Sequence, residues 1–415
     1  MPKKSSTQQN ILNDQEAVLD RIKNEKIAAI RRAFLNIDKK TKRSNTAFFL
    51  SDNIYEALPH FSTGILSLDV ILNGGLVPGR IIECYGRESS GKTALMLKCI
   101  AAAQQQGKIC CFSDVEGTFD QNWAQALGIR VDDLILTAPN SAEECFEVLT
   151  ELINSRAVDF IVVDSISALV TEQEFENDIG KQSIGLLARF LSQELKKINS
   201  LCSQTNTTVA FINQIRDTIG NFVGPSTTTT GGRALKFYSS IRLEVNKVFK
   251  SDIMEKMGNE SLSIGHTIKV KLVKSKISAP GRSSQFVLYF DGRQTDVTDE
   301  LASIILANGL IPKYDSTGKL SDSGRTYIFE LEDEKLRVTK QADMADALRK
   351  CPKIQQYFID MIKSGNYVSA QTNDDNNIDE NNIDKDNIDD NNINNANNYD
   401  QLANEAEEIE SFDDL

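Results

Sequence analysis

The stretch from Gly86 to Thr93 carries residue types and a spacing that bind phosphate. It fits the pattern G-x-x-x-x-G-K-[ST], in which backbone N–H groups and the start of a following helix attract anions. Lys92 is expected to reach the β- and γ-phosphates, and the Thr93 hydroxyl to hold Mg²⁺. The alternative is a glycine-rich turn that merely precedes a helix. As a phosphate loop, the whole stretch is a candidate for nucleotide binding: Gly86, Arg87, Glu88, Ser89, Ser90, Gly91, Lys92 and Thr93.

Three further polar side chains follow apolar segments that read as buried strands. Asp164 closes the segment 160–163 and is a candidate Mg²⁺ ligand, or else the N-cap of a following helix. Glu116 follows the segment 109–114, where a carboxylate can orient the attacking water, although a surface-loop residue is the alternative. Gln214 ends the segment 207–213, where an amide can sense the γ-phosphate.

The elements that must position these residues alternate between strand and helix. The segment 81–85 predicts a strand and 94–103 a helix, and the same alternation continues to the strand at 207–213. Further β-rich segments follow at 241–248, 267–274 and 285–290. Near-continuous apolar strands separated by helices predict an α/β fold with a mainly parallel sheet that is covered on both faces.

Both ends of the chain differ from this central part. Residues 14–37 predict a helix with one apolar stripe, and a basic linker joins it to the strand-like piece 47–50. This module needs a surface to pack on, either its own domain or a neighbouring subunit. Residues 296–367 predict a small α-rich domain, and the Asn/Asp-rich sequence beyond Gln371 predicts disorder.

Charge and cysteine content limit the functional classes. The net charge is −13, of which the tail from Gln371 contributes −14, so the rest of the chain is close to neutral and does not exclude a polyanionic partner. The seven Cys are scattered without a C-x-x-C pair, which favours reduced core thiols in a cytoplasmic protein. The sequence shows neither a signal peptide nor a run apolar enough to span a membrane, so we expect no membrane partner.

Two segments have the composition of functional loops. One is 174–181, and the other runs from Arg216 to Arg233 with four consecutive Thr and the pair Gly231-Gly232. Hydroxyls, glycine amides and basic side chains, including Arg242 beyond the loop, suit a phosphodiester backbone.

Together these motifs closely resemble the bacterial RecA recombinase family. The resemblance rests on 62–64, 86–93, 114–120, 162–165, 213–216 and 229–238, and it extends from about Ser62 to Phe290. It implies a RecA-type phosphate-loop core with a polymerisation module at residues 1–50, the ATPase core at 51–292, a small C-terminal domain at 293–370 and an acidic tail at 371–415.

The same resemblance implies roles for individual residues. Glu116 matches the glutamate that activates water, and Gln214 matches the residue that couples the γ-phosphate to the second DNA loop. Lys274 and Lys276 match lysines that reach a neighbouring subunit's ATP. Asp120 and Trp123 match nucleotide-binding positions, the latter an aromatic that stacks on adenine, although Trp123 also suits an ordinary core residue. Candidate DNA-binding residues are Ile184, Arg189, Arg216, Gly231, Gly232 and Arg233.

Some positions depart from the family pattern. Arg87, Ala94 and Gly117 replace common Pro, Thr and His residues, and none of these changes removes a named role. Thr218 stands where the bacterial proteins carry a Lys in the second loop, which predicts weaker DNA binding there.

The resemblance implies a DNA-dependent ATPase that binds ATP and Mg²⁺, forms a helical filament on single-stranded DNA and exchanges strands with homologous duplex DNA. Loader proteins and single-strand-binding proteins are further expected partners. Two alternatives remain open at this point: a ring-forming replicative helicase with the same core fold, and a non-hydrolysing recombination mediator.

Overall fold

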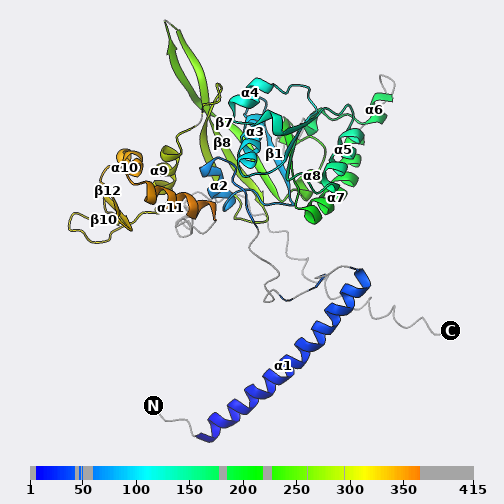
Figure 1. Cartoon of the computed structure of the whole chain (residues 1–415), viewed down its shortest axis with the longest axis vertical. Coiled ribbons are helices and arrows are strands. Elements are labelled where there is room, and N and C mark those ends of the chain that lie inside the picture. The colour runs from blue at the N-terminus through cyan, green and yellow to red at the C-terminus, as the bar shows by residue number, and fades with distance from the viewer. Residues whose placement is uncertain are drawn as a thin grey trace, which may run out of the picture. The chain divides into compact units, whose positions relative to one another are not determined.

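A computed structural model describes residues 6–42, 46–47, 49, 59–176, 185–217, 227–258, 260–293 and 295–364. The described residues include a nine-stranded sheet (Figure 1). Its strands are β1 (Ile81–Gly86), β2 (Cys110–Asp114), β3 (Leu134–Thr137), β4 (Phe160–Asp164), β5 (Thr208–Asp217), β6 (Thr227–Thr229), β7 (Ile241–Met257), β8 (Glu260–Ser275) and β9 (Ser283–Tyr289). The order is β3-β2-β4-β5-β1-β7-β8-β9, with β6 paired to β5. Strands β3 to β7 of this order run parallel, whereas β8 and β9 are antiparallel additions.

Helices cover both faces of the parallel part, as the alternating pattern predicted. They are α2 (Leu66–Leu72), α3 (Lys92–Gln105), α4 (Gln121–Ala126), α5 (Ala142–Asn154), α6 (Glu172–Glu176), α7 (Leu186–Thr205) and α8 (Ala234–Tyr238). Two separate clusters of buried side chains fill the layers, one with α2, α3 and α4 and the other with α5, α7 and α8. The adjacent Cys110 and Cys111 belong to different clusters, because successive side chains of a strand face opposite ways. The expected mainly parallel α/β core is confirmed.

Local sequence explains where α5 begins. Ser141 is its N-cap, and its side-chain oxygen accepts a hydrogen bond from Glu144 N at 3.0 Å. The Glu144 carboxylate accepts from the backbone of Asn140 at 2.7 Å, one residue before the cap. These two bonds satisfy amide groups that lack partners inside the helix, as is typical of a Ser-x-x-Glu sequence at a helix start.

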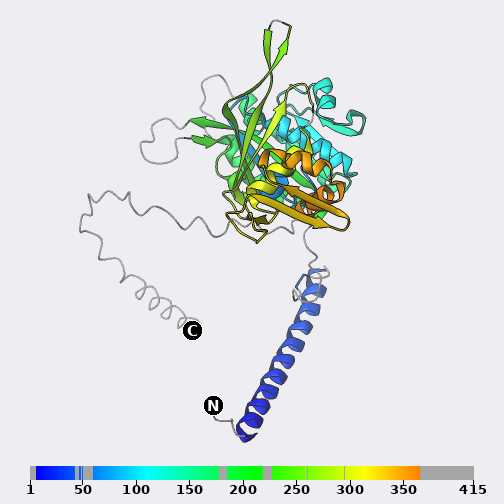
Figure 2. The same cartoon turned by 90° about the vertical axis from the view of Figure 1, so that its left-hand side faces the viewer.

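The hairpin formed by β7 and β8 is longer than the sequence analysis predicted. It extends past the rest of the sheet in both views (Figures 1 and 2). The pairing shifts register between Lys247 and Asp252, where Ser251 Oγ donates to Val248 O at 2.7 Å and accepts from Thr267 N at 3.1 Å. Such a bulge interrupts the alternation of apolar and polar residues, so periodicity alone did not extend the strands through it.

The segment after Asp296, for which the sequence predicts a small α-rich domain, contains a sheet that the sequence analysis did not include. Its helices are α9 (Val297–Asn308), α10 (Met344–Arg349) and α11 (Pro352–Lys363), and its strands are β10 (Lys313–Tyr314), β11 (Thr326–Leu331) and β12 (Glu334–Val338). Leu66 and Val70 of α2 belong to its buried cluster, and Ser67 donates to Glu300 from both its backbone and its hydroxyl. The expected domain boundaries remain predictions.

The amino-terminal helix α1 spans Ser6–Thr41 and so exceeds the predicted range at both ends. The ring of Phe49 lies 5.4 Å from that of Phe34, and Thr46 N donates to Asp38 at 2.9 Å. Several apolar side chains of α1 are exposed to solvent: Leu19, Ile22, Ile30, Leu35 and Ile37. Residues 47 and 49 of the strand-like piece 47–50 are not in a strand, and residues 48 and 50 and the whole acidic tail lie outside the described residues.

Among the described helices, none combines the length and the apolar character needed to cross a membrane. All seven Cys side chains are buried and unpaired with one another, as expected for core thiols.

Candidate active site and nucleic-acid interface

The phosphate loop connects β1 to α3, in the strand–loop–helix context that the motif requires. A Cβ at Gly86 would overlap Val245 O, and a Cβ at Gly91 would overlap the Ile268 side chain. Gly91 also has a φ of 90°, which other residues rarely adopt. The loop backbone therefore packs directly on β7 and β8, and only glycine fits at these two positions.

Lys92 begins α3 and lies inside the loop. Its Nζ donates to Arg87 O at 2.7 Å, so the ammonium group points back into the turn it follows. Burial lowers the pKa of Lys92, while the nearby Asp164, Glu116 and Glu88 raise it. A buried cation that is held by one neutral carbonyl is well placed to bind a phosphate oxygen.

Thr93 and Asp164 meet beside the loop. Thr93 Oγ1 donates to Asp164 Oδ2 at 2.6 Å, although 71 residues separate them. Burial is the main cause that raises the pKa of Asp164 to about 6; the negative charges of Glu116 and Asp114 act in the same direction, while the hydrogen bond from Thr93 and the charge of Lys92 oppose it. The two residues proposed to hold Mg²⁺ thus lie within one hydrogen bond of each other.

Glu116 lies on the same edge of the sheet. The backbone N–H groups of Val115 and Glu116 donate to Asp164 O at 2.8 and 3.2 Å, and the Glu116 carboxylate accepts from Ser165 Oγ at 2.5 Å. Ser165 Oγ also lies 2.6 Å from Ser167 Oγ. The sequence analysis did not assign a role to Ser165; its position directly after a strand-ending Asp was the available signal.

The residues present fit a magnesium nucleotide. Ser90 Oγ is buried and has no hydrogen-bond partner among the described residues, which leaves a donor inside the loop for a phosphate oxygen. The described residues contain no group of three or more His, Cys, Asp or Glu side chains that could hold a metal by themselves. Mg²⁺ normally takes few protein ligands and completes its shell with phosphate and water, so Thr93 and Asp164 suffice as its protein contacts.

Gln214 is the sensor candidate and lies next to the loop by strand register. It pairs with Gly86 across the parallel strands β1 and β5. Its N–H donates to the side-chain oxygen of Asn213 at 2.9 Å. This register brings residue 214 level with the first glycine of the phosphate loop.

Asp120 and Trp123 lie at the start of α4. The Asp120 carboxylate accepts from Trp123 N at 2.8 Å and so caps this helix. Trp123 is half-buried and packs against the core cluster that contains α3. Trp123 therefore packs partly as a core residue, which was the alternative to a nucleotide-binding role. Contact of Asp120 or Trp123 with a nucleotide remains a proposal.

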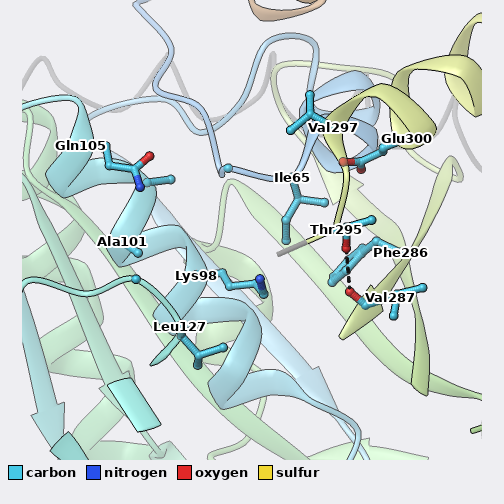
Figure 3. A pocket seen from close by; sticks show the side chains of 13 residues that line it. Ile65, Lys98, Ala101, Gln105, Leu127, Phe286, Val287, Thr295, Val297 and Glu300 are labelled. Carbon is cyan, nitrogen blue, oxygen red and sulfur yellow. Dashed lines mark hydrogen bonds between the residues drawn. The ribbon is translucent and has the colours of Figure 1, made fainter. Parts of the chain in front are cut away.

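A cavity of about 390 Å³ lies elsewhere, between α3, β9 and the start of α9 (Figure 3). Lys98 and Glu300 extend into it from opposite sides, among apolar side chains such as Ile65 and Leu127. None of the residues assigned to nucleotide binding lines this cavity, so we do not place the nucleotide there.

The candidate DNA-binding residues fall around the start of α7 and the segment before α8. A Cβ at Gly231 would lie 2.6 Å from Leu191 Cδ1, and a Cβ at Gly232 would lie 3.0 Å from Ala188 Cβ. These close approaches bring the end of the second predicted loop against α7, one turn from the exposed Arg189. Arg233 is exposed as well. Ile184 and most of both loops lie outside the described residues, and of Arg216 only the backbone is described, in β5.

Lys274 and Lys276 lie far from the phosphate loop of their own chain. Gly86 pairs with Val245 and Val245 with Val270, whereas Lys274 pairs with Arg242, near the amino end of β1. Lys274 lies level with Arg242, which is three residues from Val245, so it is roughly 10 Å along the strands from the level of the loop, and two strand spacings add about 10 Å sideways. A lysine side chain cannot span this distance, so Lys274 does not reach the phosphate loop of its own chain.

Arg242 was expected to suit a DNA backbone, but in the structure its guanidinium group forms an ion pair with Glu83. Its Nε donates to Glu83 Oε2 at 2.5 Å, and Glu83 is fully buried in β1. The Arg242 guanidinium also lies 4.5 Å above the Tyr85 ring. A carboxylate in the middle of an apolar strand was the signal in the sequence for this pair.

The chain is similar to several known proteins. A family model described as the RecA N-terminal domain matches residues 28–294. Protein RecA of Thermus thermophilus is 44% identical over 252 residues, which cover 60% of this chain and 72% of that protein. Protein RecA of Acinetobacter baumannii strain AYE is 37% identical over 323 residues, which cover 77% and 90%. A crystal structure of the RadB recombinase aligns with a TM-score of 0.43 and 24% identity, over 56% of this chain and 97% of that one.

Proposed function

The chain belongs to the RecA family, and from this premise we propose that it is a DNA-dependent ATPase that forms filaments on single-stranded DNA. The filament pairs the bound strand with homologous duplex DNA and exchanges strands, in recombination and DNA repair. Family membership favours this function over a ring-forming helicase or a non-hydrolysing mediator.

The observation that carries the ATPase proposal is the convergence of Lys92, Thr93, Asp164 and Glu116 on one edge of the sheet. Lys92 and the loop amides hold the phosphates, and Thr93 and Asp164 hold Mg²⁺. When bound, the metal neutralises charge that develops on the phosphate oxygens. Glu116, oriented by Ser165, positions the attacking water and accepts its proton.

Lys274 and Lys276 complete this site from a neighbouring subunit. Their distance from their own phosphate loop supports a role in trans, similar to an arginine finger. Each nucleotide would then lie between two subunits, so hydrolysis depends on assembly. Such a head-to-tail contact, repeated without closure, builds a helical filament.

The amino-terminal module is proposed as the polymerisation arm. The exposed apolar side chains of α1 need a partner surface, and a second copy of the chain provides one in every subunit of a filament. Arg189, Arg216 and Arg233, with Gly231 and Gly232, are proposed to bind the DNA backbone, and Ile184 to insert between bases. The acidic tail is proposed to compete with DNA for these positive groups, and loader or single-strand-binding proteins are proposed partners in the cytoplasm.

A strand-exchange assay with ATP tests the proposal. We expect homologous strand exchange that requires ATP and is abolished in Lys92→Ala, while Lys319→Ala, an exposed lysine of the small domain, behaves as wild type. Electron microscopy with DNA and an ATP analogue should show open helical filaments. Closed rings, or ATP hydrolysis that DNA does not stimulate, would contradict the recombinase function.

A further inference from the structure

Glu83 is a buried acid for which the ATPase site has no use. It lies in the middle of β1 with an exposed fraction of 0%, in a layer of apolar side chains. A carboxylate in such a place is stable only when its oxygens are paired. Arg242 of β7 donates to Oε2 at 2.5 Å and Asn213 of β5 donates to Oε1 at 3.1 Å, so both strands beside β1 contribute one partner.

Asn213 is also fully buried, and both the nitrogen and the oxygen of its side-chain amide form hydrogen bonds. Nδ2 donates to Glu83 and, at 3.1 Å, to Thr230 O, while the amide oxygen accepts from Gln214 N at 2.9 Å. Both neighbours of Nδ2 are acceptors and the neighbour of the oxygen is a donor. Only one orientation of the amide therefore satisfies all three groups.

These three bonds connect regions that serve different ligands. Thr230 directly precedes Gly231 and Gly232, the end of the second DNA loop, which packs against α7 with no room for a side chain. Gln214 lies level with Gly86 at the start of the phosphate loop. One buried amide thus holds the exit of the DNA loop on one side and the strand end beside the phosphate loop on the other.

The segment at Thr230 contains buried hydroxyl groups that could form further hydrogen bonds. The hydroxyls of Thr229 and Thr230 are buried and have no partner among the described residues. Native proteins rarely leave buried hydroxyls without partners, and a segment with two such groups can take up new hydrogen bonds at little cost. The Thr230 carbonyl, in contrast, is fixed by Asn213.

We propose that Asn213, held by Glu83, is a positioning residue that transmits the state of the ATP site to the second DNA loop through its bond to Thr230 O. The inference rests on the proposed function, because it names the element that couples the two ligands of that site. The side chains of Asn213 and Glu83 are both fully buried, so we expect neither to touch nucleotide or DNA. Their substitution should therefore change the coupling between the ligands and leave the affinity for each ligand alone unchanged.

Two variants separate the coupling from folding. Asn213→Asp removes both Nδ2 donors and places a second carboxylate against Glu83, which should lower stability as well as coupling. In the double variant Glu83→Gln/Asn213→Asp, the new Gln amide donates to the Asp and accepts from Arg242, so the buried chain of bonds is restored. The Thr230 carbonyl then loses its donor and faces a carboxylate oxygen, which can only accept. Asn246→Asp, a half-buried Asn on β7, is the matched control.

The measurement is the ratio of single-stranded DNA affinity with a non-hydrolysable ATP analogue to that with ADP, together with thermal unfolding. We expect wild type and Asn246→Asp to share one ratio and the double variant to have a ratio at least about fivefold smaller, the lower range of allosteric coupling. Its unfolding temperature should approach that of wild type, and ATP hydrolysis without DNA should be unchanged.

An affinity ratio in the double variant equal to that of wild type would overturn the inference. So would a ratio that is low in Asn213→Asp and returns to the wild-type value in the double variant together with the unfolding temperature. A wild-type protein whose DNA affinity is independent of the nucleotide would instead contradict the proposed function, and the inference with it. The two failures are distinguishable because the first requires coupling in wild type and the second requires its absence.

Discussion

Thr93 Oγ1 and Asp164 Oδ2 share a hydrogen bond of 2.6 Å that joins the first turn of α3 to the end of β4. Two oxygen atoms from elements far apart in the sequence thus meet where the phosphate loop ends. Because the carboxyl ends of parallel strands lie at one edge of the sheet, Asp164 faces the loop that follows β1.

Affinity for the magnesium nucleotide should depend on the protonation of Asp164. Burial and the charges of Glu116 and Asp114 raise the pKa of Asp164 to about 6, and a protonated carboxyl group is a poor metal ligand. Between about pH 7.5 and pH 5 the affinity should fall about tenfold, as expected for one proton that must be lost. Isothermal titration with Mg²⁺ and an ATP analogue measures this, and His266→Gln should leave the profile unchanged.

The effect on stability without ligand has the opposite sign. An acid with a raised pKa binds its proton more tightly in the folded than in the unfolded state. Its contribution to the free energy of unfolding is therefore greatest at low pH and is lost as pH rises through about 6. Asp164→Asn should remove both dependences, and an affinity profile that survives this substitution would contradict the assignment of Asp164.

Glu116→Gln should slow DNA-stimulated ATP hydrolysis by about 10²–10⁴-fold, the usual contribution of a general base. Nucleotide binding should persist, because Glu116 is not among the groups that hold the phosphates. Ser165→Ala should cause a smaller loss, since it removes only the hydrogen bond that orients the carboxylate. Glu151→Gln on the exposed face of α5 is the control, and equal rates for Glu116→Gln and this control would reject the role.

Mixed filaments should show that the lysine pair acts in trans. Glu116→Gln and Lys274→Ala/Lys276→Ala should each be nearly inactive alone. In a 1:1 mixture, about one quarter of the head-to-tail interfaces would combine an intact Glu116 with a neighbour's intact lysines. ATPase activity should then rise to about a quarter of wild type, whereas lysines acting within their own chain would give no recovery.

The native protein should react slowly with thiol reagents. All seven Cys are buried, and burial raises the pKa of each thiol, for example that of Cys84 and Cys111 to about 12. The thiolate is the reactive form, so modification should follow unfolding. Titration with a chromogenic disulfide should show no rapid phase, and Ser316→Cys at an exposed position should add one. A rapid phase in wild type would show that a thiol is accessible.

Local patterns in the sequence determined the phosphate loop, the order of strands and helices, and the cap of α5. Each depends on residues that are close in the chain: glycines where the backbone turns tightly, apolar runs that must be buried, and a Ser three residues before a Glu. The family resemblance then assigned roles to Glu116, Gln214 and the lysine pair. Strands β11 and β12 were missed because they are short and their sequences mix polar and apolar residues.

Only the tertiary structure decided which distant residues meet. Asn213 and Glu83 are 130 residues apart, and their contact exists because β5 and β1 pair in one particular register. The register of β7 and β8 likewise places Lys274 far from its own phosphate loop. It also places Arg242 beside Glu83, with which its side chain forms a hydrogen bond. Register arises from packing the whole sheet against its helices, and no local stretch of sequence contains that information.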